Sequence, residues 1–156
     1  YAEALNRMGK PNMAFAILKN GLSPTTLAID SITPPREKYS NMNNQVLHSY
    51  LTFEDQIFEY NIGVHARGCG NVHLSTDYII EPQASLPDSV KWVEDKIMEE
   101  CALETAFEGN RFHDLMRIAL RRSDPSYLAN KVAEKYIDNK EAIRAKLMDE
   151  NNWYIH

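Results

Sequence analysis

Four side chains able to bind a metal recur at every fourth position in the middle of the chain: His65, Cys69, His73 and Asp77. On one continuous helix this spacing would align them on one face. The glycines at positions 68 and 70 make a continuous helix a poor fit here. Structural zinc sites also bring their ligands in tighter pairs. We therefore expect no metal site and no cofactor.

Three carboxylates, Glu100, Glu104 and Glu108, also recur at every fourth residue and would share one face of a helix. Paired carboxylates cleave glycosides when they stand on opposite sides of the scissile bond. Neighbours on one helix face do not straddle a sugar in that way. Nearby arginines offer ion-pair partners instead: Arg111, Arg117, Arg121 and Arg122. The spacing favours a structural ion network, with Asp114 able to pair locally with Arg111, and no catalytic pair.

Aromatic and polar residues flank a glycine-rich stretch in a manner typical of sugar sites. Aromatic rings stack on the C–H faces of sugars, and amide or guanidinium groups bond the hydroxyls. The candidate ligand-binding residues are Tyr60, Arg67, Asn71 and Tyr78. The alternative, which the sequence leaves open, is that these are ordinary surface side chains while neighbouring aromatics such as Phe53 and Phe58 pack the core.

Composition narrows the function classes. The chain has 156 residues, 44% apolar and 25% charged, which fits one globular domain. Its net charge of −5 comes from acidic and basic residues mixed along the chain, so a nucleic-acid surface is not expected. No apolar run is long enough to span a bilayer. Cys101 falls in an amphipathic helical pattern, where a buried free thiol is the favoured state over a disulfide with Cys69.

The first 21 residues predict a helical hairpin of the tetratricopeptide type. A helix over residues 2–8 ends at Gly9-Lys10-Pro11, and Asn12 is the expected cap of a second helix that ends at Gly21. Residues 22–44 carry prolines and asparagines typical of loops. Beyond them we expect a helix over residues 53–61. Residues 63–87 then predict a long surface loop with one short strand over residues 77–80.

The remainder predicts a series of helices. Ser85 and Asp88 have capping-box spacing for a helix over residues 88–107, and Gly109 permits the left-handed turn that stops it. Further helices are expected over residues 112–121, 125–136 and 139–148. Residues 151–155 are expected to be extended. The whole chain, 1–156, then forms a single region with three parts: the hairpin (1–21), a variable, loop-rich insert (22–87) and the helices of 88–156.

One motif in this last part is long, irregular and charge-rich. Residues 100–117 read E-x-x-x-E-x-x-F-E-G-x-R-F-x-D-L-x-R. This motif closely resembles the signature near the C-terminus of the SusD/RagB family, and the segment Asn152-Trp153-Tyr154 is similar to the family's "NWYLP" ending. Cys101 and Thr105 depart from the family's usual Arg and Leu. The resemblance assigns a structural role to the signature residues Glu104, Glu108, Gly109, Arg111, Asp114 and Arg117.

The resemblance implies a mainly α-helical fold: the C-terminal portion of a SusD-like protein, with a partial tetratricopeptide-type hairpin and long irregular loops. It implies non-catalytic binding of an oligosaccharide or other nutrient at the cell surface. The partner would be a SusC-like, TonB-dependent transporter of the outer membrane. Membrane association would come only through a lipid anchor on a part of the protein preceding residue 1. The competing interpretation is a tetratricopeptide-type helical scaffold that binds other proteins.

Overall fold

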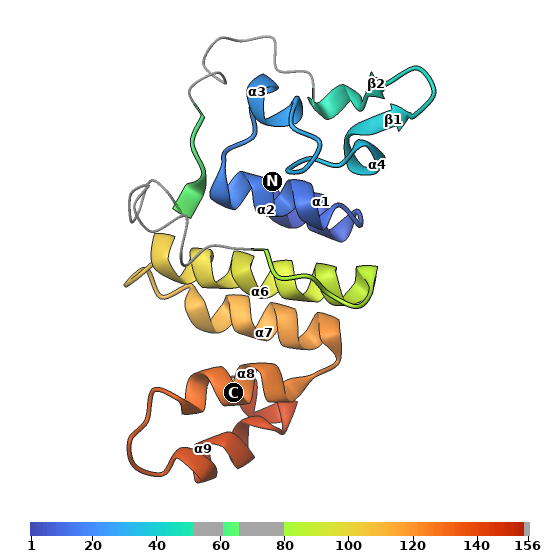
Figure 1. Cartoon of the computed structure of the whole chain (residues 1–156). Helices are drawn as coiled ribbons and strands as arrows, with labels where there is room; N and C mark the ends of the chain where they lie inside the picture. The colour runs from blue at the N-terminus through green and yellow to red at the C-terminus, as the bar shows by residue number, and fades with distance from the viewer. Residues whose placement is uncertain (52–60, 66–79, 155–156) are drawn as a thin grey trace. The chain divides into compact units, whose positions relative to one another are not determined.

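A computed structural model describes residues 1–51, 61–65 and 80–154 (Figure 1). The fold is mainly helical, as the sequence predicts. It divides into two compact units, Tyr1–Leu103 and Glu104–His156, and each is described by itself below. Among the described residues, no helix combines the length and the apolar character needed to cross a membrane.

The N-terminal unit begins with the predicted hairpin. Helix α1 (Ala2–Arg7) packs against α2 (Pro11–Lys19), and Gly9 between them has a φ of +75°. The prediction that Asn12 caps α2 is wrong, because the helix begins at Pro11 and Lys10 is the cap residue. Proline is suited to this first helical position, where its missing N–H would have no partner anyway.

Residues 22–44 contain short regular elements, so the prediction that they form only loops is wrong. They include α3 (Pro24–Leu27), α4 (Pro35–Lys38) and β1 (Tyr39–Asn41). Strand β2 (Val46–Leu47) pairs antiparallel with β1, and the 3-10 helix η1 (Ser49–Leu51) follows. Two of the three prolines that suggested loops, Pro24 and Pro35, are instead the first residues of single helical turns.

A buried lysine ties these short elements together. The side chain of Lys38 is 2% exposed, and its Nζ donates to the carbonyl of Leu27 and to Oδ1 of Asp30, both at 2.6 Å. The buried hydroxyl of Thr33 donates to carbonyl oxygens of the same turn, including that of Leu27 at 3.2 Å. Buried polar groups of this kind are tolerated because each one is hydrogen-bonded.

The long helix α6 (Leu86–Glu104) completes the N-terminal unit. Ser85 caps it as predicted, since its Oγ accepts from the backbone N–H of Asp88 at 3.3 Å. Val93 and Ile97 of α6 join the core that the hairpin forms, and the rings of Trp92 and Phe15 lie 5.4 Å apart. The helix ends at Glu104, three residues before the predicted end, and Gly109 (φ +80°) lies in the turn beyond it.

The C-terminal unit is built from α7 (Arg111–Arg122), α8 (Pro125–Ala133), α9 (Lys140–Leu147) and the 3-10 helix η4 (Glu150–Trp153). The three α-helices match the predicted ones to within three residues at each end. Their buried side chains form one core: Leu115, Ala119, Leu128, Ala129, Leu147 and Trp153.

The prediction of an extended ending over residues 151–155 is wrong for residues 151–153, while Tyr154 is extended and residue 155 lies outside the described residues. The side chain of Asp149 accepts from the N–H of Asn151 at 3.0 Å, which starts the turn of η4. The predicted helix over residues 53–61 and the predicted strand over residues 77–80 lie outside the described residues, except for their last positions. Neither Asn61 nor Ile80 belongs to a helix or strand.

Candidate ligand-binding concavity

All four ligand-binding residues predicted from the sequence, Tyr60, Arg67, Asn71 and Tyr78, lie outside the described residues. The same holds for three of the four spaced metal-binding candidates: Cys69, His73 and Asp77. Within the described ranges, no group of three or more histidine, cysteine or carboxylate side chains could hold a metal ion.

The fourth metal-binding candidate, His65, instead meets one of the three spaced carboxylates. Its Nδ1 lies 2.6 Å from Oε1 of Glu100, and the two side chains are 15% and 7% exposed. This contact joins the segment around residue 65 to the buried side of α6. Cys101, the next residue along α6, is half-buried and packs against the same core.

The signature residues lie at and after the end of α6. Glu104 and Glu108 are both exposed, and Oε2 of Glu108 accepts from Nδ2 of Asn110 at 3.3 Å. In α7, a guanidinium nitrogen of Arg117 lies 3.4 Å from Oδ1 of Asp114. Surface ion pairs of this type contribute at most about 1 kcal/mol to stability. The role that the resemblance assigns to these residues remains a proposal.

Side chains at the surface of the N-terminal unit form a polar aromatic group. The ring of His48 stacks on that of Tyr50, with centroids 4.9 Å apart and planes 13° from parallel. Nζ of the buried Lys10 donates to the Tyr50 hydroxyl, and the Tyr1 hydroxyl donates to the Tyr50 carbonyl at 2.8 Å. Burial, and then the charge of Lys10, lower the pKa of His48. Burial, and then Tyr50, raise the pKa of Tyr1.

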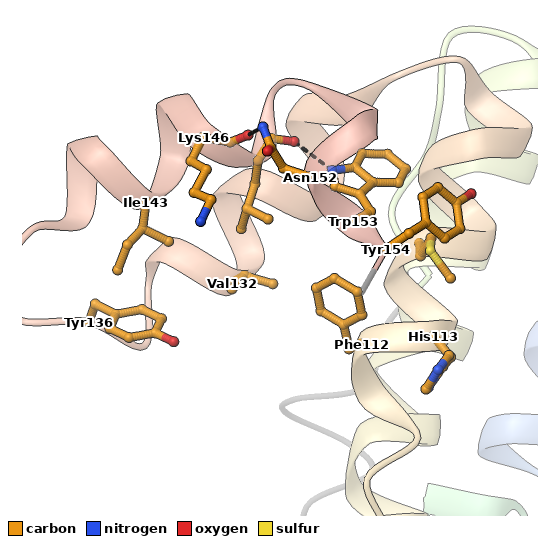
Figure 2. A pocket seen from close by; sticks show the side chains of 11 residues that line it. Phe112, His113, Val132, Tyr136, Ile143, Lys146, Asn152, Trp153 and Tyr154 are labelled. Atoms are coloured by element: carbon orange, nitrogen blue, oxygen red, sulfur yellow. Dashed lines mark hydrogen bonds between the residues drawn. The ribbon is translucent and has the colours of Figure 1, made fainter. Parts of the chain in front are cut away.

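A concavity of about 680 Å³ opens in the C-terminal unit (Figure 2). This volume falls within the range of small-molecule sites, about 300–1,000 Å³. Every side chain that lines it comes from α7, α8, α9, η4 or the residues close to their ends. The lining consists of Phe112, His113, Met116, Val132, Tyr136, Ile143, Lys146, Leu147, Asn152, Trp153 and Tyr154.

Two hydrogen bonds fix the wall that η4 contributes. The indole N–H of Trp153 donates to the carbonyl of Leu147 at 2.7 Å, and Nδ2 of Asn152 donates to the carbonyl of Lys146 at 2.9 Å. Both acceptors belong to the last turn of α9, whose carbonyls have no partner within the helix. The turn after α9 therefore folds back onto that helix and holds the Trp153 ring against the core.

The lining combines an apolar wall with few polar groups. Phe112, Met116, Val132 and Ile143 are partly buried and pack on the core that Leu147 and Trp153 help to form. The Lys146 side chain turns its ammonium end into the concavity (Figure 2). No aspartate or glutamate is among the lining residues. Such a surface, which also includes the imidazole of His113, can bind a ligand and hold it.

Sequence reasoning did not find this concavity. The candidate ligand-binding residues predicted from the sequence all lie in the loop-rich insert instead. The signal that could have pointed here is the clustering of Trp153 and Tyr154 behind a short helix that carries Lys146. That signal has no fixed spacing, because the wall forms only when three helices pack.

Comparison with known families decides the classification. The family model described as "SusD family" matches residues 1–155. The chain belongs to the SusD family. No curated protein and no solved structure matches it. The SusD family is a family of binding proteins, generally non-catalytic, that bind nutrients such as glycans at the cell surface. The predicted resemblance to SusD/RagB proteins is thereby confirmed.

Proposed function

We propose that this chain takes part in the capture of an oligosaccharide or other nutrient at the outer-membrane surface and its delivery to a SusC-like, TonB-dependent transporter. The observation that carries the proposal is the SusD family match over residues 1–155. The partly apolar concavity of the C-terminal unit also supports a binding role. On this proposal the protein performs no covalent chemistry, and a lipid anchor outside residues 1–156 attaches it to the membrane.

Calorimetric titration against plant, host and microbial oligosaccharides tests nutrient capture. We expect saturable binding of at least one class by the chain or by a longer protein that contains it. Substituting Tyr60, Arg67, Asn71 and Tyr78 one at a time by alanine then tests our proposal that these residues contact the ligand. Weakened binding without a change in melting temperature is the expected result, and unchanged affinity in all four variants would contradict that assignment.

Delivery to a transporter needs its own test. Co-expression with a SusC-like transporter from the same genome, followed by affinity purification in mild detergent, should recover a one-to-one complex. Recovery of the chain alone would argue against the partner. The competing proposal, a tetratricopeptide-type scaffold, draws on the packed α1–α2 hairpin. It predicts peptide binding and no binding of oligosaccharides or other nutrients.

A further inference from the structure

We infer that the concavity of the C-terminal unit binds a molecule with an apolar body and one acidic group, such as an arylalkyl carboxylate. This inference rests on the proposed function and names the class of nutrient that this site takes. It follows from three features of the lining: its apolar character, the hydrogen bonds that already engage Asn152 and Trp153, and its charge.

The walls are suited to an apolar body. Four aromatic rings, Phe112, Tyr136, Trp153 and Tyr154, stand around the concavity together with branched aliphatic side chains (Figure 2). Tyr136 and Tyr154 are 48% and 52% exposed, so a ligand can remove much apolar surface from water by covering them. Aromatic and aliphatic burial is the main favourable term when such ligands bind.

The aliphatic parts of the wall disfavour a neutral sugar. Asn152 and Trp153 already donate to the end of α9, to the carbonyls of Lys146 and Leu147. A sugar carries a hydroxyl on most of its carbons, and each hydroxyl held against Val132 or Ile143 would lose its water without gaining a partner. Such unsatisfied polar groups weaken binding.

The charge of the lining selects an acidic group. The ammonium end of Lys146 is turned into the concavity (Figure 2), and no carboxylate lines it. Across the described ranges, no carboxylate pairs with Lys146. Nε of the neighbouring Arg144 donates instead to Oδ1 of Asn130 at 2.6 Å. In a chain with a net charge of −5, this cation is free to bond a ligand carboxylate.

A matched pair of probes tests the inference. We would titrate the full chain with 4-phenylbutyrate and with 4-phenylbutanol, which share a body and differ in the acidic group. Heat of binding is the first readout. The second is the fluorescence of Trp153, in a Trp92→Phe background that leaves a single tryptophan. We expect 4-phenylbutyrate to bind about fivefold more tightly than the alcohol, as suits pairing with an exposed lysine, and this advantage to shrink at high salt.

Lysine variants locate the acidic group. Lys146→Gln should remove the fivefold advantage of the carboxylate and leave the affinity for the alcohol unchanged. Lys140→Gln is the control, because Lys140 lies on the same helix and does not line the concavity. Both side chains are exposed, so both variants should fold.

The outcomes separate this inference from the proposed function. Equal affinities for acid and alcohol, or no binding of either, would overturn the inference. Oligosaccharide binding in the panel would then leave the proposed function standing. Concentration-dependent dimerisation that blocks both probes would show that a second copy of the chain covers the concavity, which also overturns the inference.

Discussion

The carboxylate of Glu37, in α4, reaches the first turn of α2, where its Oε2 accepts from the backbone N–H of Met13 at 2.9 Å. Its Oε1 accepts from Nδ2 of Asn12 at 2.6 Å. Helix α2 has no side-chain cap of its own, because its cap residue is Lys10. A carboxylate 24 residues away in the sequence therefore supplies the acceptor that this helix end lacks.

Replacing Glu37 by Gln should destabilise the N-terminal unit. Glu37 is only 3% exposed, and the amide keeps one acceptor but loses the charge that favours the helix N-terminus. We expect a loss of about 1–3 kcal/mol in the free energy of unfolding, measured by urea denaturation with tryptophan fluorescence as the probe. Glu81→Gln, at an exposed position, is the control. Equal midpoints for the two variants would show that Glu37 is not needed to cap α2.

The close contact between Gly63 and the end of α2, also in the N-terminal unit, predicts a larger loss of stability. A Cβ atom added at Gly63 would lie 2.2 Å from the carbonyl oxygen of Lys19, at the end of α2. Backbone atoms cannot yield as a side-chain tip can, so Gly63→Ala should displace residues 61–65 and cost more than about 2 kcal/mol.

Gly109→Ala is the matched comparison for Gly63→Ala. Its φ of +80° strains an alanine, but no atom lies within 4 Å of the added Cβ. The expected cost is about 1–2 kcal/mol, from backbone strain alone. Thermal unfolding of both variants checks that Gly63→Ala lowers the melting temperature more than Gly109→Ala does. The opposite result would mean that the contact between residues 61–63 and α2 is loose.

The sequence predicts best where structure depends on neighbours in the chain. Helices α6 and α8 were predicted because their caps are local: the Oγ of Ser85 accepts from the N–H of Asp88, and Oδ1 of Asp124 accepts from the N–H of Ser126 at 3.1 Å. Helices α7 and α9 have no side-chain cap, and their periodic apolar residues were the signal. The short elements between residues 22 and 47 were missed because proline serves loops and first helical turns equally well. A single turn buries too little to leave a periodic pattern.

Contacts between distant residues explain most of what the sequence does not predict. Nothing near Glu37 in the sequence indicates that it caps α2, and the concavity appears only when α7, α8 and α9 pack. The family resemblance, by contrast, was readable because its motif in residues 100–117 is long and irregular. It predicted the fold class and the family without indicating where a ligand would bind.

The buried pair His65–Glu100 predicts strong coupling between two positions 35 residues apart. His65→Leu removes a hydrogen-bond partner from a carboxylate that is 7% exposed, so a loss of about 1–3 kcal/mol is expected. Glu100→Leu should lower the free energy of unfolding less in the His65→Leu background than in the parent chain. A double-mutant cycle by urea denaturation should give a coupling energy of about 0.5–3 kcal/mol. A coupling near zero would mean that the two groups do not bond in solution.

His48 predicts a loss of stability on acidification. Burial and Lys10 lower its pKa from 6.5 in the folded chain, so the unfolded chain binds the proton more readily. The stabilising effect of the neutral ring is complete above pH 6.5 and is lost as the pH falls through the lowered pKa. Between about pH 7 and pH 5, His48→Phe should show a smaller drop in melting temperature than the parent chain. A comparison at about pH 8, where the imidazole is neutral in both states, isolates the packing effect of the substitution. Identical pH profiles would contradict the prediction.

Trp153→Phe tests how η4 is held against the C-terminal unit. Phenylalanine cannot donate to the Leu147 carbonyl, which accepts from the indole at 2.7 Å. Its smaller ring also leaves a cavity at a buried position, since Trp153 is only 5% exposed. The lost hydrogen bond and the smaller ring together should cost about 1–3 kcal/mol, measured by circular dichroism during urea denaturation. Tyr154→Phe is the control, since Tyr154 is 52% exposed and should change stability by less than about 0.5 kcal/mol. If both variants unfold at the parent's midpoint, the turn after α9 does not need its indole bond, and the wall of the concavity must be held by the apolar packing of α7 to α9.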